Sequence, residues 1–220
     1  MKVCVLYSGG KDSNLALLKA YEEFEVVCLI TLSPKSEEST LFHYPNTEIV
    51  KLQAESLGIP LIMKTCSDDE ESSLKALYNV LTKAKETYDV NGVVTGAIRS
   101  TYQATRFQRI CDDLELWCFN PLWLRDEISI LNEALENGFE IVFVRVAGLE
   151  KTLLGKKLTA NIIQKFTEMR NYLNPAGEGG EYETLVLDGP ILKKKIVLEN
   201  VEVEWKRDHG MLIVKKARLG

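Results

Sequence analysis

The sequence is poor in the residues that form disulfide frameworks and metal centres. It has two histidines and five cysteines in 220 residues, and no two cysteines stand in a Cys-x-x-Cys pair. Disulfide frameworks and zinc sites need closer clusters of these residues. We therefore expect buried free thiols, and the sequence argues against a histidine-rich metal centre.

Long apolar runs are also missing. No stretch approaches the roughly 20 apolar residues of a membrane helix. The apolar run after Met1 is too short for the core of a signal peptide. Hydrophobic residues make up 45% and charged residues 27%, the balance of an ordinary globular protein. We expect a cytoplasmic protein that does not bind membranes.

The formal net charge is −5, from 27 basic and 32 acidic residues. This balance argues mildly against broad nucleic-acid binding, and we expect no direct nucleic-acid partner. The segment from Lys193 to Gly220 is basic, with eight Lys or Arg against four Asp or Glu. It is either a set of amphipathic strands with solvated lysines or a docking surface.

Short apolar runs and helical spacings alternate along the first part of the chain. Runs typical of buried strands cover residues 3–7, 26–32, 61–65 and 93–95. Helical spacing follows each run; the first helix should turn Leu15, Leu18 and Tyr21 inward, and Ser100 should cap the fourth. Four such alternations predict an α/β domain with a parallel, Rossmann-like sheet and crossover helices.

The pattern changes between Pro121 and Asp126. A helix beginning at Asp126, a strand over 139–146 and a helix carrying Ile162 to Leu173 precede three β-rich segments, 182–187, 195–205 and 211–217. We predict a first domain over residues 1–124 and a smaller α+β domain over residues 125–220.

A loop suited to phosphate lies directly between the first strand and the first helix. It reads Ser8-Gly9-Gly10-Lys11-Asp12-Ser13. Glycines let backbone N–H groups approach an anion, and the helix N-terminus adds unpaired N–H donors and partial positive charge. Two serine hydroxyls and the Lys11 ammonium complete a pyrophosphate cradle. The alternative is an incidental Gly-Gly turn.

Asp12 is the unexpected member of this loop. A carboxylate repels phosphates unless a cation stands between them, so we expect Asp12 to hold a bridging Mg²⁺. The spacing is neither that of a P-loop nor Gly-x-Gly-x-x-Gly.

The six residues from Ser8 to Ser13 resemble the PP-loop of the N-type ATP pyrophosphatases, which have the adenine nucleotide α-hydrolase-like fold. The resemblance implies that ATP binds there through its β- and γ-phosphates. A substrate oxygen then attacks the α-phosphate, giving an adenylated intermediate, pyrophosphate and finally AMP. Lys11, Asp12 and Ser13 would be the catalytic residues.

Other residues should line the nucleotide. Leu32 and Ser33 end the second strand, and Gly96, followed by Ala97 and Ile98, ends the fourth, at the edge where open α/β sheets bind ligands. Gly96 could instead be a plain strand-ending glycine. His43 lies in a loop between a strand and a helix, where a nucleotide contact and a surface position are both possible.

Three further stretches resemble one branch of this superfamily, the diphthine–ammonia ligases. They are Ser39–His43, the stretch from Gly96 to Trp123 with Ser100, Tyr102-Gln103, Arg106 and Cys111, and Gly177–Thr184 running into Leu187–Pro190. In that family ATP and ammonia amidate diphthine, a modified histidine of translation elongation factor 2, giving diphthamide. The resemblance implies elongation factor 2 and ammonia as partners.

The glycine-rich run Gly177-Glu178-Gly179-Gly180-Glu181-Tyr182-Glu183-Thr184 is the most specific of these stretches. Glycines are poor in helices and strands, so we expect a loop. Close carboxylates raise one another's pKa unless a cation meets them. The trimethylammonium of diphthine is such a cation, and tyrosine ring faces could also contact it. The predicted substrate-binding residues are Tyr102, Gln103, Glu178, Gly179, Gly180, Glu181, Glu183 and Thr184. The alternative is an exposed acidic turn.

Two other functions remain possible. A tRNA-modifying enzyme of the same superfamily would need cysteine pairs and a basic surface, neither of which the sequence has. An adenine-nucleotide sensor would use the same loop without releasing pyrophosphate, and would leave the acidic run without a role.

Overall fold

The computed structural model describes residues 1–34, 47–67 and 69–220. Contacts divide the chain into two compact units. The first contains residues 1–8 and 12–123, and the second contains residues 9–11 and 124–220. The short segment Gly9–Lys11 thus belongs by its contacts to the second unit, although the sequence places it inside the first.

The first unit is built on a five-stranded parallel sheet. Its strands are β1 (Lys2–Leu6), β2 (Glu25–Pro34), β3 (Leu61–Cys66), β4 (Gly92–Val94) and β5 (Trp117–Phe119), in the order β3-β2-β1-β4-β5. Every neighbouring pair is parallel. The predicted α/β fold is therefore confirmed. The sequence did not predict β5, because its three residues are too few to show a period and Trp117 among them is exposed.

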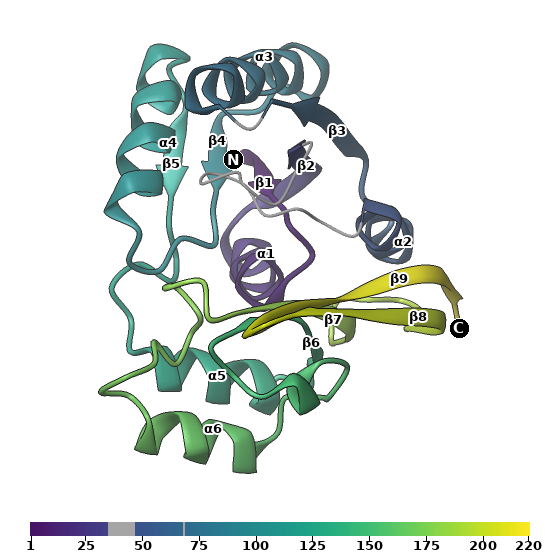
Figure 1. Ribbon diagram of the computed structural model, residues 1–220. Helices are drawn as coiled ribbons and strands as arrows, with labels where there is room; N and C mark the ends of the chain where they lie inside the picture. Colours follow the sequence, from purple (N-terminus) through teal and green to yellow (C-terminus); the bar gives the residue numbers. More distant parts are fainter. Residues whose placement is uncertain (35–46, 68) are drawn as a thin grey trace. The chain divides into compact units, whose positions relative to one another are not determined.

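Crossover helices connect these strands. They are α1 (Lys11–Glu23), α2 (Thr47–Leu57), α3 (Glu70–Tyr88) and α4 (Thr101–Asp113). Right-handed crossovers that run first toward β3 and then back toward β5 put α1 and α2 on one face and α3 and α4 on the other. Figure 1 shows this arrangement around the sheet.

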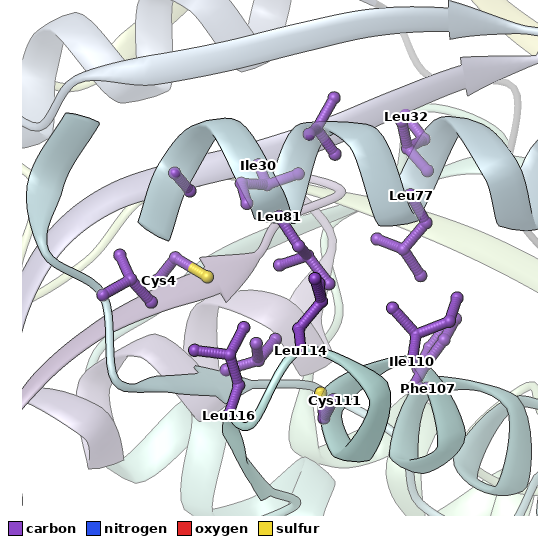
Figure 2. Packing of buried hydrophobic residues seen from close by; sticks show 14 of the residues in the cluster. Cys4, Ile30, Leu32, Leu77, Leu81, Phe107, Ile110, Cys111, Leu114 and Leu116 are labelled. Atoms are coloured by element: carbon purple, nitrogen blue, oxygen red, sulfur yellow. The ribbon is translucent and has the colours of Figure 1, made fainter. Parts of the chain in front are cut away.

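Buried side chains fill the layer between the sheet and the second pair of helices. Cys4 and Ile30 from the sheet meet Leu77 and Leu81 of α3 and the inner face of α4 (Figure 2). All five cysteines are free thiols, four of them buried and one half-buried. The expectation of free thiols is therefore confirmed.

The predicted inner face of α1 was partly wrong. Leu15 and Leu17 are fully buried, whereas Tyr21 is 40% exposed. Tyr21 lies in the last turn of α1, next to Glu22 and Glu23, which are exposed as well. At α4 the sequence prediction holds, since Ser100 caps the helix by accepting a hydrogen bond from Gln103 N at 3.3 Å.

The second unit is an antiparallel sheet with two helices, which confirms the α+β prediction. Its strands are β6 (Glu140–Ala147), β7 (Tyr182–Asp188), β8 (Ile196–Lys206) and β9 (His209–Leu219), in the order β7-β6-β9-β8. The helices are α5 (Glu127–Glu136) and α6 (Ala160–Glu168), with a short 3₁₀ turn, η1 (Lys151–Leu153). The predicted helix through Leu173 was too long, because α6 ends at Glu168.

Cross-strand ion pairs engage three of the eight basic residues of the C-terminal segment. Glu199 on β8 pairs with Lys216 and Arg218 on β9, at 2.7 and 2.8 Å. Glu202 pairs with Lys215 at 3.1 Å. These pairs favour the interpretation as amphipathic strands. Within the described ranges, the helices are all too short or too polar to cross a membrane.

Candidate functional site

The first unit has a topological switch point beside its central strand. The chain leaves β1 toward β2 on one side, and returns from β3 to β4 on the other side. The loops that follow β1 and β4 therefore diverge at the carboxyl edge of the sheet, where open α/β sheets bind ligands. Ser8 lies in the first loop and residues 95–100 lie in the second. Ser13 lies in the first turn of α1, which follows the first loop.

Gly96 brings these two loops into direct contact. A Cβ atom added at Gly96 would lie 2.9 Å from Asp12 C and 3.0 Å from both Asp12 O and Ser13 N. Real Cβ atoms essentially never come so close to backbone, so this position requires the absence of a side chain. The second loop is held in turn by Thr95, whose hydroxyl donates to Asn120 Oδ1 at 2.5 Å and accepts from Ala97 N at 3.2 Å.

The other residues predicted to contact adenosine differ in how far their side chains are exposed to solvent. Ile98 is completely buried and Leu32 is 5% exposed, so their side chains belong to the core and only their backbone could meet a ligand. Ser33, near the end of β2, is half-buried. His43 lies outside the described residues.

Polar groups converge at the start of α1. Gly9 has φ +79°, a backbone conformation that favours glycine. The hydroxyl of Ser8 donates to Ser13 Oγ at 3.2 Å, and Tyr7 Oη donates to Asn14 Oδ1 at 2.9 Å. The first backbone N–H groups of a helix have no partner within the helix, and its dipole is positive there. This end of α1 is therefore suited to an anion.

The segment Gly9–Lys11 makes its own contacts within the second unit. Val186 N donates to Gly9 O at 3.0 Å, and Lys11 N donates to Thr184 Oγ1 at 3.1 Å. The Lys11 side chain is 5% exposed. Its ammonium donates to Ala176 O at 2.5 Å and lies 5.0 Å from the centroid of the Tyr182 ring. Sequence reasoning did not anticipate this anchoring, because the two segments are more than 160 residues apart.

Glu181 closes the glycine-rich segment into a compact loop. Its Oε1 accepts a hydrogen bond from Asn174 N at 2.8 Å, and its carbonyl accepts one from Ala147 N at 2.8 Å. Asn174 Oδ1 accepts from Ala176 N at 2.9 Å. A Cβ at Gly179 would lie 2.6 Å from the Glu181 carboxylate. A glycine at this position therefore avoids a steric clash with that carboxylate.

The three glutamates predicted to share a loop have different surroundings. Glu178 is exposed and Glu181 is half-buried. Glu183 lies on β7, opposite Arg145 of β6. The distance from Arg145 Nη1 to Glu183 Oε1 is 3.2 Å. The expectation that Glu183 belongs to the loop was therefore wrong. The β-rich segment predicted over residues 182–187 is confirmed instead, because β7 begins at Tyr182.

Tyr102 also has a partner that the sequence did not reveal. The guanidinium carbon of Arg106 lies 3.4 Å from the centroid of the Tyr102 ring, and the Tyr102 hydroxyl donates to Glu70. Arg106 Nε lies 2.5 Å from Glu70 Oε1. One face of the ring predicted to meet a substrate cation is thus covered by a cation of the chain itself. Hydrogen bonds from Arg106 and Tyr102 lower the pKa of the Glu70 carboxyl.

Protein side chains alone do not form a metal centre in the part of the chain that the structure describes. No three His, Cys, Asp or Glu side chains gather there as metal ligands would. Asp12, in the first turn of α1 and beside the Gly96 contact, fits a magnesium ion that takes its remaining ligands from phosphate and water.

Comparison with known proteins gives consistent matches. The family model of the diphthamide synthase N-terminal domain matches residues 1–117, and that of the C-terminal domain matches residues 125–219. A diphthine–ammonia ligase of Schizosaccharomyces pombe is 37% identical over 226 residues, covering 92% of this chain and 37% of that protein. One from Danio rerio is 33% identical over 224 residues, covering 92% of this chain and 88% of that protein.

Among solved structures, a predicted subunit of tRNA methyltransferase from Methanocaldococcus jannaschii is 17% identical, with a TM-score of 0.49. It is covered completely by the match, which includes 89% of this chain. The chain spans little more than a third of the S. pombe relative but most of the D. rerio one.

Proposed function

The chain belongs to the diphthamide synthase family, and we propose that it is an ATP-dependent ligase that amidates diphthine with ammonia. The curated relatives of that family carry the name diphthine–ammonia ligase. The structural observation that carries the proposal is the contact of the Ser8–Ser13 loop with Gly96 at the switch point of the parallel sheet.

ATP is the nucleotide that this loop would bind. Hydroxyls of Ser8 and Ser13 and backbone N–H groups at the start of α1 would meet the β- and γ-phosphates. The backbone of Gly96, Ala97 and Ile98, with that of Leu32 and Ser33, would line the adenosine. Asp12 would hold Mg²⁺, which when bound offsets the charge of the phosphates.

The reaction would proceed through an acyl-adenylate. A carboxylate oxygen of diphthine attacks the α-phosphorus, an O–P bond forms, and the bond to the β-phosphate breaks to release pyrophosphate. Ammonia then attacks the acyl carbon, loses a proton, and AMP leaves with the original carboxylate oxygen. Lys11, Asp12 and Ser13 remain the residues proposed to act on the phosphates.

The amide acceptor would be translation elongation factor 2 carrying diphthine. Its trimethylammonium group needs a carboxylate that solvent can reach, and Glu178 is the exposed glutamate of the glycine-rich segment. Gly179 and Gly180 beside it carry no side chains that would block a large substrate. Glu181 and Glu183, which are engaged in loop closure and in the pair with Arg145, would support this surface.

Isotope labelling tests the proposed reaction. The protein is incubated with ATP, labelled ammonium and diphthine-bearing elongation factor 2 whose carboxylate carries heavy oxygen. We expect pyrophosphate and AMP in equal amounts, heavy oxygen in AMP, and the nitrogen label in the amide.

Heavy oxygen in inorganic phosphate, together with ADP, would refute the acyl-adenylate. ATP binding without any pyrophosphate release in the complete mixture would refute the ligase and favour a nucleotide sensor. The matched control omits only the ammonium, and in this mixture no amide should form.

A further inference from the structure

β7 is an edge strand of the second unit's sheet, and Gly9–Lys11 runs along its open edge. β7 pairs with β6 on its other side. Gly9 accepts from Val186, and Lys11 donates to Thr184, so the segment runs antiparallel to the strand. Edge strands present a row of backbone groups that otherwise lack partners. Here Gly9 O supplies a partner to the backbone N–H of Val186.

The hydrogen bond from Lys11 N is accepted by a side chain, the hydroxyl of Thr184. Lys11 is the first residue of α1, and its N–H is one of the donors that a helix leaves without an internal acceptor. Thr184 Oγ1 accepts it at 3.1 Å. Lys11 and Thr184 are only 5% and 8% exposed, so water has little access to replace the hydroxyl.

The strand that carries Thr184 is well anchored. Thr184 stands opposite Phe143 on β6 in the register of the sheet. Two residues earlier, the Tyr182 ring stacks on Phe166 at 5.4 Å and meets Phe143 edge-on at 5.1 Å. The Tyr182 hydroxyl donates to Pro175 O at 2.5 Å. A hydroxyl on such a strand can fix the loop that it binds.

We propose that Thr184 is a positioning residue of the phosphate loop and does not contact the amide acceptor. Its hydroxyl fixes the Lys11 amide, and with it the start of the helix whose first turn is proposed to meet the phosphates. This inference rests on the proposed binding of ATP by the loop. It assigns the last residue of the glycine-rich run to the nucleotide and not to diphthine.

Kinetics of three variants test the assignment. Thr184→Val keeps the shape of the side chain and removes the acceptor, Thr184→Ser keeps the acceptor, and Thr184→Ala provides a second deletion should the valine not fold. In Thr184→Val and Thr184→Ala, the deletion variants that lack the hydroxyl, we expect the KM and Kd for ATP to rise about tenfold. A tenfold change equals about 1.4 kcal/mol of binding free energy. The KM for the diphthine-bearing protein should not change. Thr184→Ser should stay within about threefold of wild type, because it retains the one hydrogen bond at stake.

Thr167→Val is the matched control. The Thr167 hydroxyl donates to Ile163 O at 2.9 Å within α6 of the same unit. Its removal should change neither KM. A deletion variant with unchanged ATP affinity, or one with a raised KM for the protein substrate alone, would overturn the proposal.

Hydrogen exchange of the Lys11 amide separates this inference from the proposed function. The amide should be protected in wild type and in Thr184→Ser, and should exchange faster in the deletion variants, whether or not the protein turns over. If the wild type released no pyrophosphate, the ligase would fail while exchange still tested the contact. Equal protection in wild type and Thr184→Val would remove its structural basis.

Discussion

Substitution of Gly96 is the sharpest test of where the nucleotide binds. In Gly96→Ala the new methyl group would lie 2.9 to 3.0 Å from backbone atoms of Asp12 and Ser13. Backbone at the start of a helix cannot rotate away as a flexible side chain can. We therefore expect the loop to shift by a few tenths of an ångström or more.

The magnitude follows from two effects. Overpacking a tight site costs about 1–3 kcal/mol of stability. A shifted loop also loses contacts to phosphate, and each hydrogen bond to a charged group contributes about 1.5–3 kcal/mol. Loss of one such bond raises the Kd for ATP by about tenfold or more. Gly96→Val should have a larger effect on both measurements.

Gly138→Ala is a control with a similar stability cost and no contact with the loop. Gly138 has φ +79°, and a Cβ there would meet nothing within 4 Å. Its cost is left-handed backbone strain of about 1–2 kcal/mol. Calorimetric titration with ATP and thermal unfolding should show both variants destabilised, but only Gly96→Ala weakened in ATP binding. A folded Gly96→Ala protein with wild-type affinity would refute the placement.

Four further predictions concern charged groups. Lys11→Ala should weaken ATP binding at least about tenfold by calorimetry, because it removes both the positive charge proposed to act on the phosphates and the ammonium that holds the loop at Ala176 O; wild-type affinity would contradict this. Glu178→Gln should raise the KM for the diphthine-bearing protein at unchanged ATP affinity and melting temperature. Glu183→Gln should instead lower stability by about 1–3 kcal/mol in urea, since it leaves a part-buried arginine without its partner. Because Arg106 lowers the pKa of Glu70, their pair stabilises the fold above the usual carboxyl pKa and is lost as pH falls through the lowered value. Acid titration of Glu70→Gln should therefore show a smaller loss of stability than wild type; an identical acid limb would show that this pair does not matter.

The turn from β1 into α1 was predictable from sequence because its signal is local. An apolar run, two glycines and a helical spacing follow one another within about 20 residues, and each has a direct structural meaning. The same holds for the cap at Ser100 and for the alternating β and α segments of the first unit. Strand order, by contrast, has no local signal, and neither does the three-residue strand β5.

The glycine-rich run shows what tertiary structure decided. Its sequence identifies a special segment, but three glutamates with the same side chain end in three settings: exposed, closing a loop, and paired across strands. The settings of Glu181 and Glu183 depend on Asn174, Ala147 and Arg145, which the sequence does not connect to them.

The sequence by itself thus determined that a glycine turn leads into α1 and that a glycine-rich acidic segment follows Pro175. Only the folded structure decided that Arg106 covers Tyr102 and that Thr184 holds Lys11. The physical reason is that a hydrogen bond or ring contact depends on which distant strand or helix supplies the partner. Side-chain chemistry limits the possible partners, and packing of the sheet and its loops selects one of them.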